Sequence, residues 1–350
     1  MKETDVTTTS AEAEVSDTVS GGDVAALAGV SVKTVSNVVN GYEHVRPQTR
    51  AKVQQAIDDL GYRPNLSARS LRRGQTGIIA LAVPELTSAY FAEIARGVIE
   101  NAEERGLTVL VDQTDGRRER ELLVLQGIRS NLVDGAIFSP LALGRDDGPA
   151  LRAKVPLVLL GERVFDGNAD HVAFDNVAAA RVAVEHLVAR GRTQIAVIGA
   201  QNPRTAETAH LRIQGYRDAV RSAGLSTPAA FEVQVDHWHR ADGAKAARRL
   251  LSGSSRPDAI FCCNDVLALG AIRELHLAGV RVPDDIAVVG IDDIEEAAFS
   301  TPSLSTVAPD KAALAKLSVQ LLVERISNPS PRTAPRDIQV GFELIVRDSS

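Results

Sequence analysis

Hydrophobic residues follow two different patterns along the chain. Between Ser20 and Tyr62, short apolar groups recur at helical spacing, and each group ends at a glycine, at position 29, 41 or 61. From Gly77 onward, short and almost continuous apolar runs alternate with longer amphipathic stretches. The first pattern predicts three short helices, and the second predicts strands that alternate with helices.

The alternating region is expected to form parallel sheets. Strands that are apolar along their whole length are typical of a sheet covered by helices on both faces. The runs form two series, from 78–83 to 156–160 and from 171–174 to 286–290, followed by a helix at 311–327 and a strand near 338–346. We therefore expect two doubly wound lobes, with a ligand bound at the carboxyl ends of the strands.

Composition limits the class of protein. With 350 residues, of which 44% are apolar, the chain is long enough for two or three domains. No apolar run approaches the roughly 18 residues of a membrane helix, and residues 1–20 lack the apolar segment of a secretory signal. A cytoplasmic protein without membrane contact is expected, in which the adjacent Cys262 and Cys263 remain thiols and fill the core.

The charge is distributed unevenly. The formal net charge is −6 for the whole chain, but residues 18–76 carry +4, between a tail at 1–17 of −4 and a remainder of −6. This asymmetry indicates an anionic partner for the basic segment alone. The tail is rich in Thr, Ser, Ala and acidic residues, and we expect it to be disordered.

The basic segment has the pattern of a helix-turn-helix motif. Ser20, followed three residues later by Asp23, is typical of a helix N-cap. A second short helix follows a glycine-containing turn, and such a helix enters the major groove of DNA in known motifs. In this helix the valines can pack inward, while the polar residues face outward: Lys33, Thr34, Ser36 and Asn37. Any small three-helix domain has a solvated polar face, so this pattern alone leaves DNA binding open.

The sequences DVAALAGVSVKTVSNVVNG and VRPQTRAKVQQAIDDLGYRPNLSARSLR resemble the DNA-binding headpiece of the LacI/GalR family of bacterial transcription regulators. The resemblance continues, more loosely, over residues 19–347. It implies an all-α helix-turn-helix headpiece and an α/β body of two doubly wound lobes with the type I periplasmic-binding-protein fold.

The resemblance also implies a division into domains. The expected parts are a disordered tail at 1–17, a helix-turn-helix domain at 18–64, a hinge helix or linker at 65–76, and an effector-binding and dimerisation domain at 77–350. Within the last, the first lobe is expected at 77–161 and 308–330, and the second at 162–307 and 331–350.

DNA contacts are implied for residues on and near the second helix. By resemblance, Val32 and Lys33 select bases, and phosphates are positioned by Thr34, Ser36, Asn40 and Tyr62. Asn37 stands where the family usually has arginine, which grips guanine in a bidentate way that asparagine does not, so a different base preference is expected.

Gly21 and Gly22 also depart from the family pattern, which has an apolar residue and a lysine in this first helical turn. Each glycine costs about 0.8–1 kcal/mol relative to alanine, so the first helix is expected to start late or fray.

The stretch NLSARSLRRGQT has helical potential but too little apolar surface to fold alone. By resemblance it is a hinge helix, of which two copies enter the minor groove of DNA. Ala68 would lie against the bases, Leu71 would wedge into the central step and kink the duplex, and Asn65 and Arg69 would add DNA contacts. A plain linker is the alternative, but it does not require a leucine among arginines.

Polar residues at the predicted strand ends are candidates for the effector site. The family's effector-binding arginine corresponds to Arg212, while Asn264 and Asp292 each follow a strand. An arginine fork, an amide and a carboxylate can together hold sugar hydroxyls, and Trp238 can offer a ring face. Arg212 could instead be a surface charge and Trp238 a core residue.

The first lobe supplies three further candidates for the effector site. These are Tyr90, Phe91 and Ser139. The two aromatic residues could instead hold their helix against the sheet.

Other functions remain as alternatives. His237 and His239 flank Trp238, but no third histidine or cysteine lies near them in the sequence, so no metal site is expected. The common nucleotide-binding, hydrolase and zinc-protease motifs do not occur, so no cofactor and no catalysis are expected. An enzyme is one rival, and a sugar-binding transport protein is another, although the latter needs a secretory signal and no headpiece.

The overall prediction is a homodimeric DNA-binding repressor that recognises a palindromic operator. A small-molecule effector between the two lobes controls it, either a sugar or sugar derivative, or a nucleoside or purine.

Overall fold

The computed structural model describes residues 19–39, 41–62, 75–126, 132–143, 156–161, 169–201, 207–328 and 334–350. It divides into two compact units, Met1–Gly74 and Gln75–Ser350, which we call the headpiece and the body. The tail at 1–17 and five predicted DNA-contacting residues lie outside the described residues, namely Asn40, Asn65, Ala68, Arg69 and Leu71.

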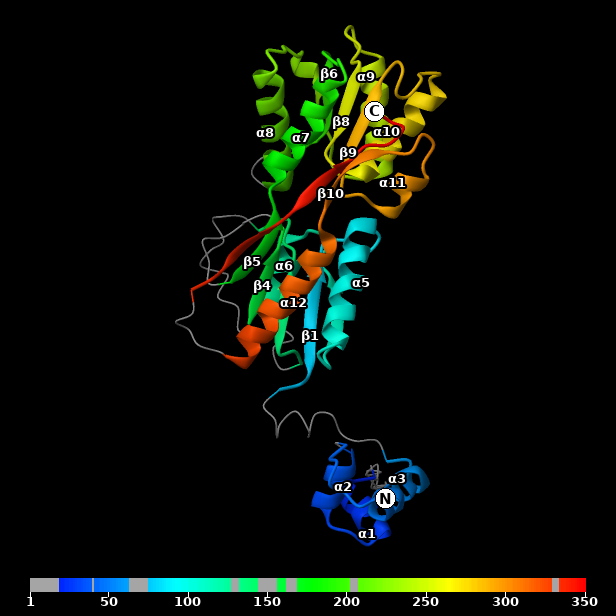
Figure 1. Cartoon of the computed structure of the whole chain (residues 1–350), viewed down its shortest axis with the longest axis vertical. Coiled ribbons are helices and arrows are strands. Elements are labelled where there is room, and N and C mark those ends of the chain that lie inside the picture. Colours follow the sequence, from blue (N-terminus) through cyan, green and yellow to red (C-terminus); the bar gives the residue numbers. More distant parts are fainter. Residues whose placement is uncertain are drawn as a thin grey trace, which may run out of the picture. The chain divides into compact units, whose positions relative to one another are not determined.

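The described headpiece consists of three helices, α1 (Gly21–Ala28), α2 (Val32–Val39) and α3 (Pro47–Leu60), as Figure 1 shows. They enclose a small core of valine and alanine side chains: Val24, Ala25, Val35, Val38, Val53 and Ala56. The glycines at 29, 41 and 61 have positive φ angles, as expected for residues that follow a helix.

Helix α1 begins at Gly21, so the expectation that it starts late is wrong. A capping box forms its first turn: the Ser20 hydroxyl accepts hydrogen bonds from the N–H groups of Gly22 and Asp23, and the Asp23 carboxylate accepts from the Ser20 N–H at 2.8 Å. These bonds satisfy N–H groups that the first turn leaves without helical partners, which offsets the cost of the glycines. A Cβ atom at Gly21 would lie only 3.3 Å from the Tyr62 hydroxyl, so the glycine also makes room for Tyr62.

The described body contains two six-stranded sheets. The first sheet is entirely parallel, in the order β11-β5-β4-β3-β1-β2. Its strands are β1 (Ile78–Val83), β2 (Thr108–Gln113), β3 (Gly135–Phe138), β4 (Leu157–Leu160), β5 (Asp170–Phe174) and β11 (Asp337–Val340). The helices of this lobe are α5 (Ala89–Glu103), α6 (Arg118–Gln126) and α12 (Lys311–Ser327).

The second sheet has the order β12-β10-β9-β8-β6-β7, with only β12 antiparallel. Its strands are β6 (Ile195–Ala200), β7 (Glu232–Gln234), β8 (Ala259–Cys262), β9 (Ala287–Ile291), β10 (Ser305–Pro309) and β12 (Phe342–Ile345). The helices are α7 (Asn176–Ala189), α8 (Glu207–Ser222), η2 (Ala229–Phe231), α9 (Arg240–Leu251), α10 (Asp265–Leu277) and α11 (Glu295–Phe299). The predicted fold class, a helical headpiece with two doubly wound lobes, is confirmed.

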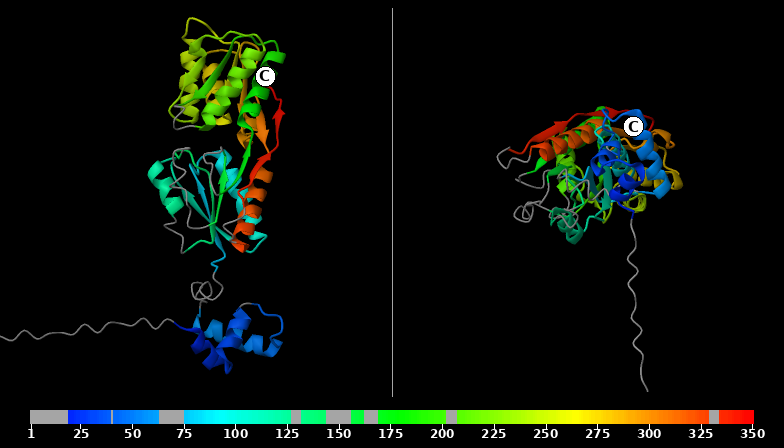
Figure 2. Two further views of the ribbon diagram at one scale, coloured as in Figure 1. Left: turned by 90° about the vertical axis from the view of Figure 1, so that its left-hand side faces the viewer. Right: turned by 90° about the horizontal axis from the view of Figure 1, so that it is seen from below.

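The chain passes between the lobes three times, at β5 to α7, β10 to α12 and β11 to β12 (Figures 1 and 2). These crossovers contact one another. The rings of Phe174 and Phe342 lie 6.5 Å apart, and the N–H of Asp310 donates to the carbonyl of Gly341 at 3.0 Å. The three segments therefore form a single connection between the two lobes.

The predicted lobe boundaries at 162 and 331 differ from the structure. Strands β5 and β11 were expected in the second lobe, but β5 pairs with β4 and β11 pairs with β5, so both belong to the first sheet. An apolar run shows that a strand forms but not which sheet it joins, because pairing depends on residues distant in the sequence. The expected final strand near 338–346 likewise divides at Gly341 into one strand for each sheet.

Within the described residues, no helix is long and apolar enough to cross a membrane.

Candidate nucleic-acid interface and effector site

Helix α2 has one buried and one accessible side. Val35 and Val38 pack into the headpiece core, whereas Val32 is 52% exposed and Lys33 is also exposed. Three predicted DNA-contacting residues on this helix are half-buried: Thr34, Ser36 and Asn37. The inward packing of Val35 and Val38 follows the predicted spacing, and the accessible side carries a cation together with hydroxyl and amide groups.

Two local interactions shape the region around α2. The Ser31 hydroxyl accepts a hydrogen bond from the Thr34 N–H at 3.1 Å and lies 2.9 Å from the Thr34 hydroxyl. The Arg50 guanidinium of α3 donates to the carbonyl of Tyr42 at 2.7 Å, which fixes the loop after α2. Thr34 and Arg50 therefore already have structural roles.

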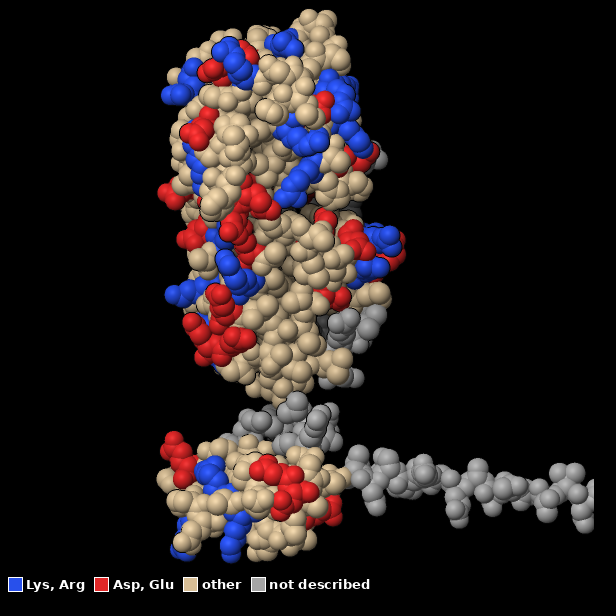
Figure 3. All heavy atoms as spheres, turned by 90° about the vertical axis from the view of Figure 1, so that its right-hand side faces the viewer, with Lys and Arg blue, Asp and Glu red and all other residues tan. Residues whose placement is uncertain are grey.

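Charges of both signs occur on the surfaces that Figure 3 displays. Lys and Arg side chains are interspersed with Asp and Glu on the drawn faces of the headpiece and of the body. Neither drawn face presents a large field of one sign.

Arg212 of α8 is the centre of a buried polar cluster in the body. Its side chain is only 5% exposed. The guanidinium donates from Nε to Asn176 Oδ1 at 2.7 Å and from Nη1 to the carbonyl of Cys263, and Nη2 lies 3.5 Å from Asp292 Oδ1. Arg212 is therefore not the surface charge that the alternative interpretation assumed.

Two aromatic rings lie close to the same guanidinium. Its Cζ atom is 5.6 Å from the ring centroid of Phe174 and 5.3 Å from that of Trp238, which is within cation–π range. The Trp238 indole N–H donates to the carbonyl of Gly199 at 3.0 Å. Trp238 is half-buried, so it contributes to the core and also contacts the Arg212 cluster.

The parallel topology explains how these residues meet. Phe174 ends β5, Cys263 follows β8 and Asp292 follows β9, so each stands at the carboxyl end of a strand. Cys263 and Asp292 therefore lie on the same side of the second sheet, whereas Phe174 lies at the carboxyl end of a strand of the first sheet. Ligands of doubly wound sheets bind at such strand ends. Arg212 approaches from α8, and Asn176 lies in the first turn of α7, directly after the first crossover.

Asn264 is buried and caps α10. Its Oδ1 atom accepts a hydrogen bond from the N–H of Leu267 at 2.8 Å, so this oxygen is already engaged by the helix. Asn264 is adjacent to Cys263 and thus borders the cluster.

The first-lobe candidates occupy two places. Tyr90 and Phe91 lie at the start of α5, half-buried against the main core, with their rings 5.2 Å apart in an edge-on arrangement. This packing agrees with the alternative in which they hold their helix against the sheet. Ser139 follows β3 and is buried at the carboxyl end of the first sheet.

Sequence analysis missed Phe174 and Asn176. The polar residues that directly follow the apolar strand at 171–174 are a signal for Asn176, the same signal that identified Asp292. Phe174 is an apolar residue within that strand, so no such signal marks it.

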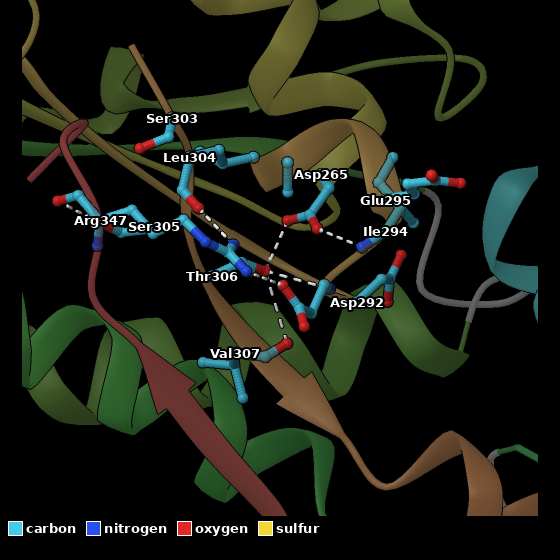
Figure 4. Close-up of polar contacts among 12 residues, drawn as sticks. Asp265, Asp292, Ile294, Glu295, Ser303, Leu304, Ser305, Thr306, Val307 and Arg347 are labelled. Carbon is cyan, nitrogen blue, oxygen red and sulfur yellow. Dashed lines mark hydrogen bonds and ion pairs between the residues drawn. The ribbon is translucent and has the colours of Figure 1, made fainter. Parts of the chain in front are cut away.

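A buried carboxyl group supports the turn that carries Asp292. Asp265 accepts hydrogen bonds from the Thr306 hydroxyl at 2.6 Å and from the N–H of Ile294 at 3.1 Å (Figure 4). Burial, reinforced by the nearby Asp292 carboxylate, raises the pKa of Asp265 well above its ordinary value. Asp265 therefore has a structural role, because it holds the turn that carries Asp292.

The two cysteines fill the core beside the cluster. Both are free thiols and fully buried. Burial raises the pKa of Cys263 to about 12, although the Arg212 charge acts in the opposite direction. A thiol with so high a pKa is a poor nucleophile at neutral pH.

Comparison with known proteins finds a matching family for each of the two units. Residues 22–65 match the family described as bacterial regulatory proteins, lacI family, and residues 184–350 match the periplasmic binding protein-like domain. The ribose operon repressor of Escherichia coli (strain K12) is 36% identical over 310 residues, which cover 88% of this chain and 93% of that protein.

Solved structures show similarity over almost the whole chain. The lac repressor dimer bound to operator and the anti-inducer ONPF has a TM-score of 0.80 and 28% identity, covering 95% of this chain and 98% of that one. A complex of the transcriptional regulator CelR with cellobiose has a TM-score of 0.70 and 31% identity, covering 95% of this chain and all of that one, 100%.

Proposed function

Because the chain belongs to the lacI family of bacterial regulatory proteins, we propose that it represses transcription by binding operator DNA and that a small neutral sugar in the body controls this binding. The observation that carries the sugar assignment is the buried Arg212 cluster with its paired charges. The operator-binding part rests on family membership and on the exposed side of α2.

The charge balance of the cluster favours a neutral ligand. Transferring a guanidinium group from water to a protein interior is costly unless a counter-charge and hydrogen bonds compensate. Asp292, Asn176 and the carbonyl of Cys263 supply that compensation. Since Asp292 already offsets the charge of Arg212, a phosphorylated or carboxylated ligand would bring a negative charge without an obvious partner in the cluster.

The chemistry of the surrounding groups favours a carbohydrate. A sugar hydroxyl both donates and accepts hydrogen bonds, so it can pair with the guanidinium and with the Asp292 carboxylate. The rings of Phe174 and Trp238 match the apolar face of a sugar ring. Among the relatives, one is named a ribose operon repressor and another is a complex with cellobiose.

A purine nucleoside is the second candidate, because the same two rings could stack on a flat base. The two ligands place different requirements on the site. A purine base must lie parallel to an aromatic ring, whereas a sugar must form hydrogen bonds from its hydroxyls to both the Arg212 guanidinium and the Asp292 carboxylate.

We propose that the protein acts as a homodimer. A palindromic operator presents two half-sites about one helical turn apart, and each needs its own headpiece. The similar lac repressor structure is that of a dimer on operator DNA. The predicted hinge residues Asn65, Ala68, Arg69 and Leu71 would contribute minor-groove contacts, and Asn40 and Tyr62 would contribute phosphate contacts.

Effector control follows from linkage. A ligand changes DNA affinity only through its different affinities for two conformations of the body. The three crossovers let the lobes change their mutual arrangement, and the cluster includes residues directly next to the first crossover, Phe174 and Asn176.

Trp238 provides a direct test, because it is the only tryptophan in the chain. D-ribose, cellobiose and adenosine are titrated while Trp238 fluorescence is recorded. A saturable change with a sugar, absent in Arg212→Lys, supports the proposal. A response to adenosine alone favours the second candidate, and chemical turnover of any probe indicates an enzyme instead.

A further inference from the structure

Lys311 connects the two lobes next to the Arg212 cluster. It is the first residue of α12, a helix that packs against α5 and the first sheet. Its ammonium group nevertheless binds the second lobe: Nζ donates to the carbonyl of Asp292 at 2.8 Å and to that of Asp293 at 2.7 Å. The third acceptor is Glu93 Oε2, at 2.5 Å. These three acceptors use all three N–H bonds of the ammonium group.

The two carbonyls belong to a turn with an unfavourable backbone conformation. Asp292 has a φ angle of 121° and Asp293 a φ angle of 47°, values that residues other than glycine rarely adopt. Such a conformation persists only where surrounding contacts impose it.

Several contacts hold this turn from within the second lobe. The N–H of Asp292 donates to the carbonyl of Val307 at 2.9 Å, and the Asp293 carboxylate pairs with Arg347 at 2.7 Å. The N–H of Asp293 is 3.3 Å from the Thr306 hydroxyl, which in turn donates to Asp265 (Figure 4). Lys311 adds the contact from the first-lobe side.

Glu93 extends the connection to α5. One of its carboxylate oxygens binds Lys311, and the other accepts a hydrogen bond from the N–H of Glu295 at 3.3 Å. The side chains of Lys311 and Glu93 are only 17% and 24% exposed, so water screens this pair less than it screens a surface ion pair. Glu93 thus contacts both the cation and the start of α11 in the second lobe.

The conformation of this turn determines where the Asp292 carboxylate lies. That carboxylate faces Arg212 across 3.5 Å, whereas the carbonyl of the same residue binds Lys311. A change of backbone angles at Asp292 would move both groups together. The contact with Lys311 therefore affects the geometry of the Arg212 cluster. The contacts of Arg212 described above do not include Lys311.

We propose that Lys311 is a positioning residue for effector binding. With Glu93, it holds the Asp292–Asp293 turn in the conformation that presents the Asp292 carboxylate to Arg212 and ties this turn to α5 of the first lobe. The part of the proposal that concerns ligand affinity rests on the proposed function, whereas the part that concerns the turn does not.

The first experiment uses the ligand-free full chain. Hydrogen exchange of the amides of residues 287–299 is measured by mass spectrometry in wild type, Lys311→Met, Lys311→Arg and Lys316→Met. Lys316 is exposed on the same helix and serves as the matched control. Lys311→Met is expected to accelerate exchange in this segment at least tenfold without accelerating it in α10, Lys311→Arg is expected to restore part of the protection, and Lys316→Met is expected to match wild type. Unchanged exchange in Lys311→Met would overturn the proposal.

The second experiment measures affinity for D-ribose, cellobiose and adenosine by Trp238 fluorescence. Lys311→Met is expected to weaken binding of the responding probe at least tenfold. The double variant Lys311→Met/Asp292→Asn is expected to bind no more weakly than Asp292→Asn alone, because Lys311 acts through Asp292. Additive losses, or unchanged affinity despite faster exchange, would refute the positioning role. If wild type binds none of the three probes, the proposed ligand class fails, and the exchange data alone decide whether Lys311 holds the turn.

Discussion

At the scale of single residues, the charge pair of Arg212 and Asp292 is the most informative feature of the body. Both side chains are buried, and each would be costly to bury without the other. The rings of Phe174 and Trp238 lie close to the guanidinium group of Arg212, and such a group is attracted to the faces of aromatic rings.

We predict that Asp292→Asn destabilises the protein and weakens its binding of the effector. The substitution leaves the Arg212 charge buried without its counter-charge, so the free energy of unfolding is expected to fall by about 3 kcal/mol. Chemical denaturation of the full chain measures this loss. Asp218→Asn, on the exposed side of the same helix as Arg212, is the control and is expected to cost less than about 1 kcal/mol. Equal losses in the two variants would contradict the role of the pair.

Sequence reasoning identified part of this cluster. Arg212, Trp238 and Asp292 were predicted from family resemblance and from their places after strands, and the structure brings them together. Phe174, Asn176 and Lys311 were missed. Their roles depend on the crossovers between lobes, and nothing in the local sequence of a crossover indicates which distant residues it meets.

At the scale of elements, a buried ion network joins the edge of the first sheet to its covering helix. Asp170, at the start of β5, is fully buried and pairs with Arg325 of α12 at 2.7 Å and with Arg336 at 2.8 Å. Burial favours a higher pKa, but the hydrogen bonds from the two arginines outweigh it and lower the pKa of Asp170 to about 2. This network ties β5, α12 and the segment before β11 together.

The network predicts a specific dependence of stability on pH. A carboxyl group whose pKa is lower in the folded state contributes stability above its unfolded pKa, and loses it as pH falls through the folded value. Asp170 should therefore contribute about 2–3 kcal/mol near neutral pH, lost between about pH 4 and pH 2.

Urea denaturation of wild type and Asp170→Asn across this range measures the contribution of Asp170. The two proteins are expected to differ near neutral pH and to converge toward pH 2, whereas Asp284→Asn, at an exposed ion pair, should follow wild type throughout. A constant difference between wild type and Asp170→Asn at all pH values would contradict this explanation.

Most elements of the fold were predictable. Apolar runs located the strands from β1 to β9, and helical periodicity located α12 at its observed bounds, 311–327. Strand β10 and helix α11 were not predicted, because a five-residue strand ending in proline and a single helical turn have too few residues for periodicity to emerge. The assignment of β5 and β11 failed because strand pairing is a long-range property.

At the scale of the whole molecule, the proposed regulation requires a DNA-binding unit and a ligand-binding unit that influence one another. The segment that joins them includes Leu71, which lies outside the described residues and which the family resemblance assigns to the minor groove. Wedging a side chain into a base step costs unstacking energy and allows further contacts to form on bent DNA.

We predict that Leu71→Ala weakens operator binding at least tenfold while leaving binding to non-specific DNA nearly unchanged. The reason is that non-specific binding depends on phosphate contacts and counterion release, to which an alanine or leucine contributes little. Fluorescence anisotropy with an operator duplex, selected from a random pool, and with a scrambled duplex measures both affinities. Equal losses on the two duplexes would exclude the wedge.

We predict that occupancy of the Arg212 cluster changes the affinity of the headpiece for DNA. The most direct measurement is operator affinity, by fluorescence anisotropy at fixed salt, with and without the sugar that perturbs Trp238, in wild type and in Arg212→Lys. Coupling energies of about 1–3 kcal/mol are typical of allosteric proteins, so a change of at least fivefold is expected in wild type and none in the variant. A sugar that saturates the body of the wild-type protein but leaves operator affinity unchanged would contradict the proposed coupling between the Arg212 cluster and the headpiece.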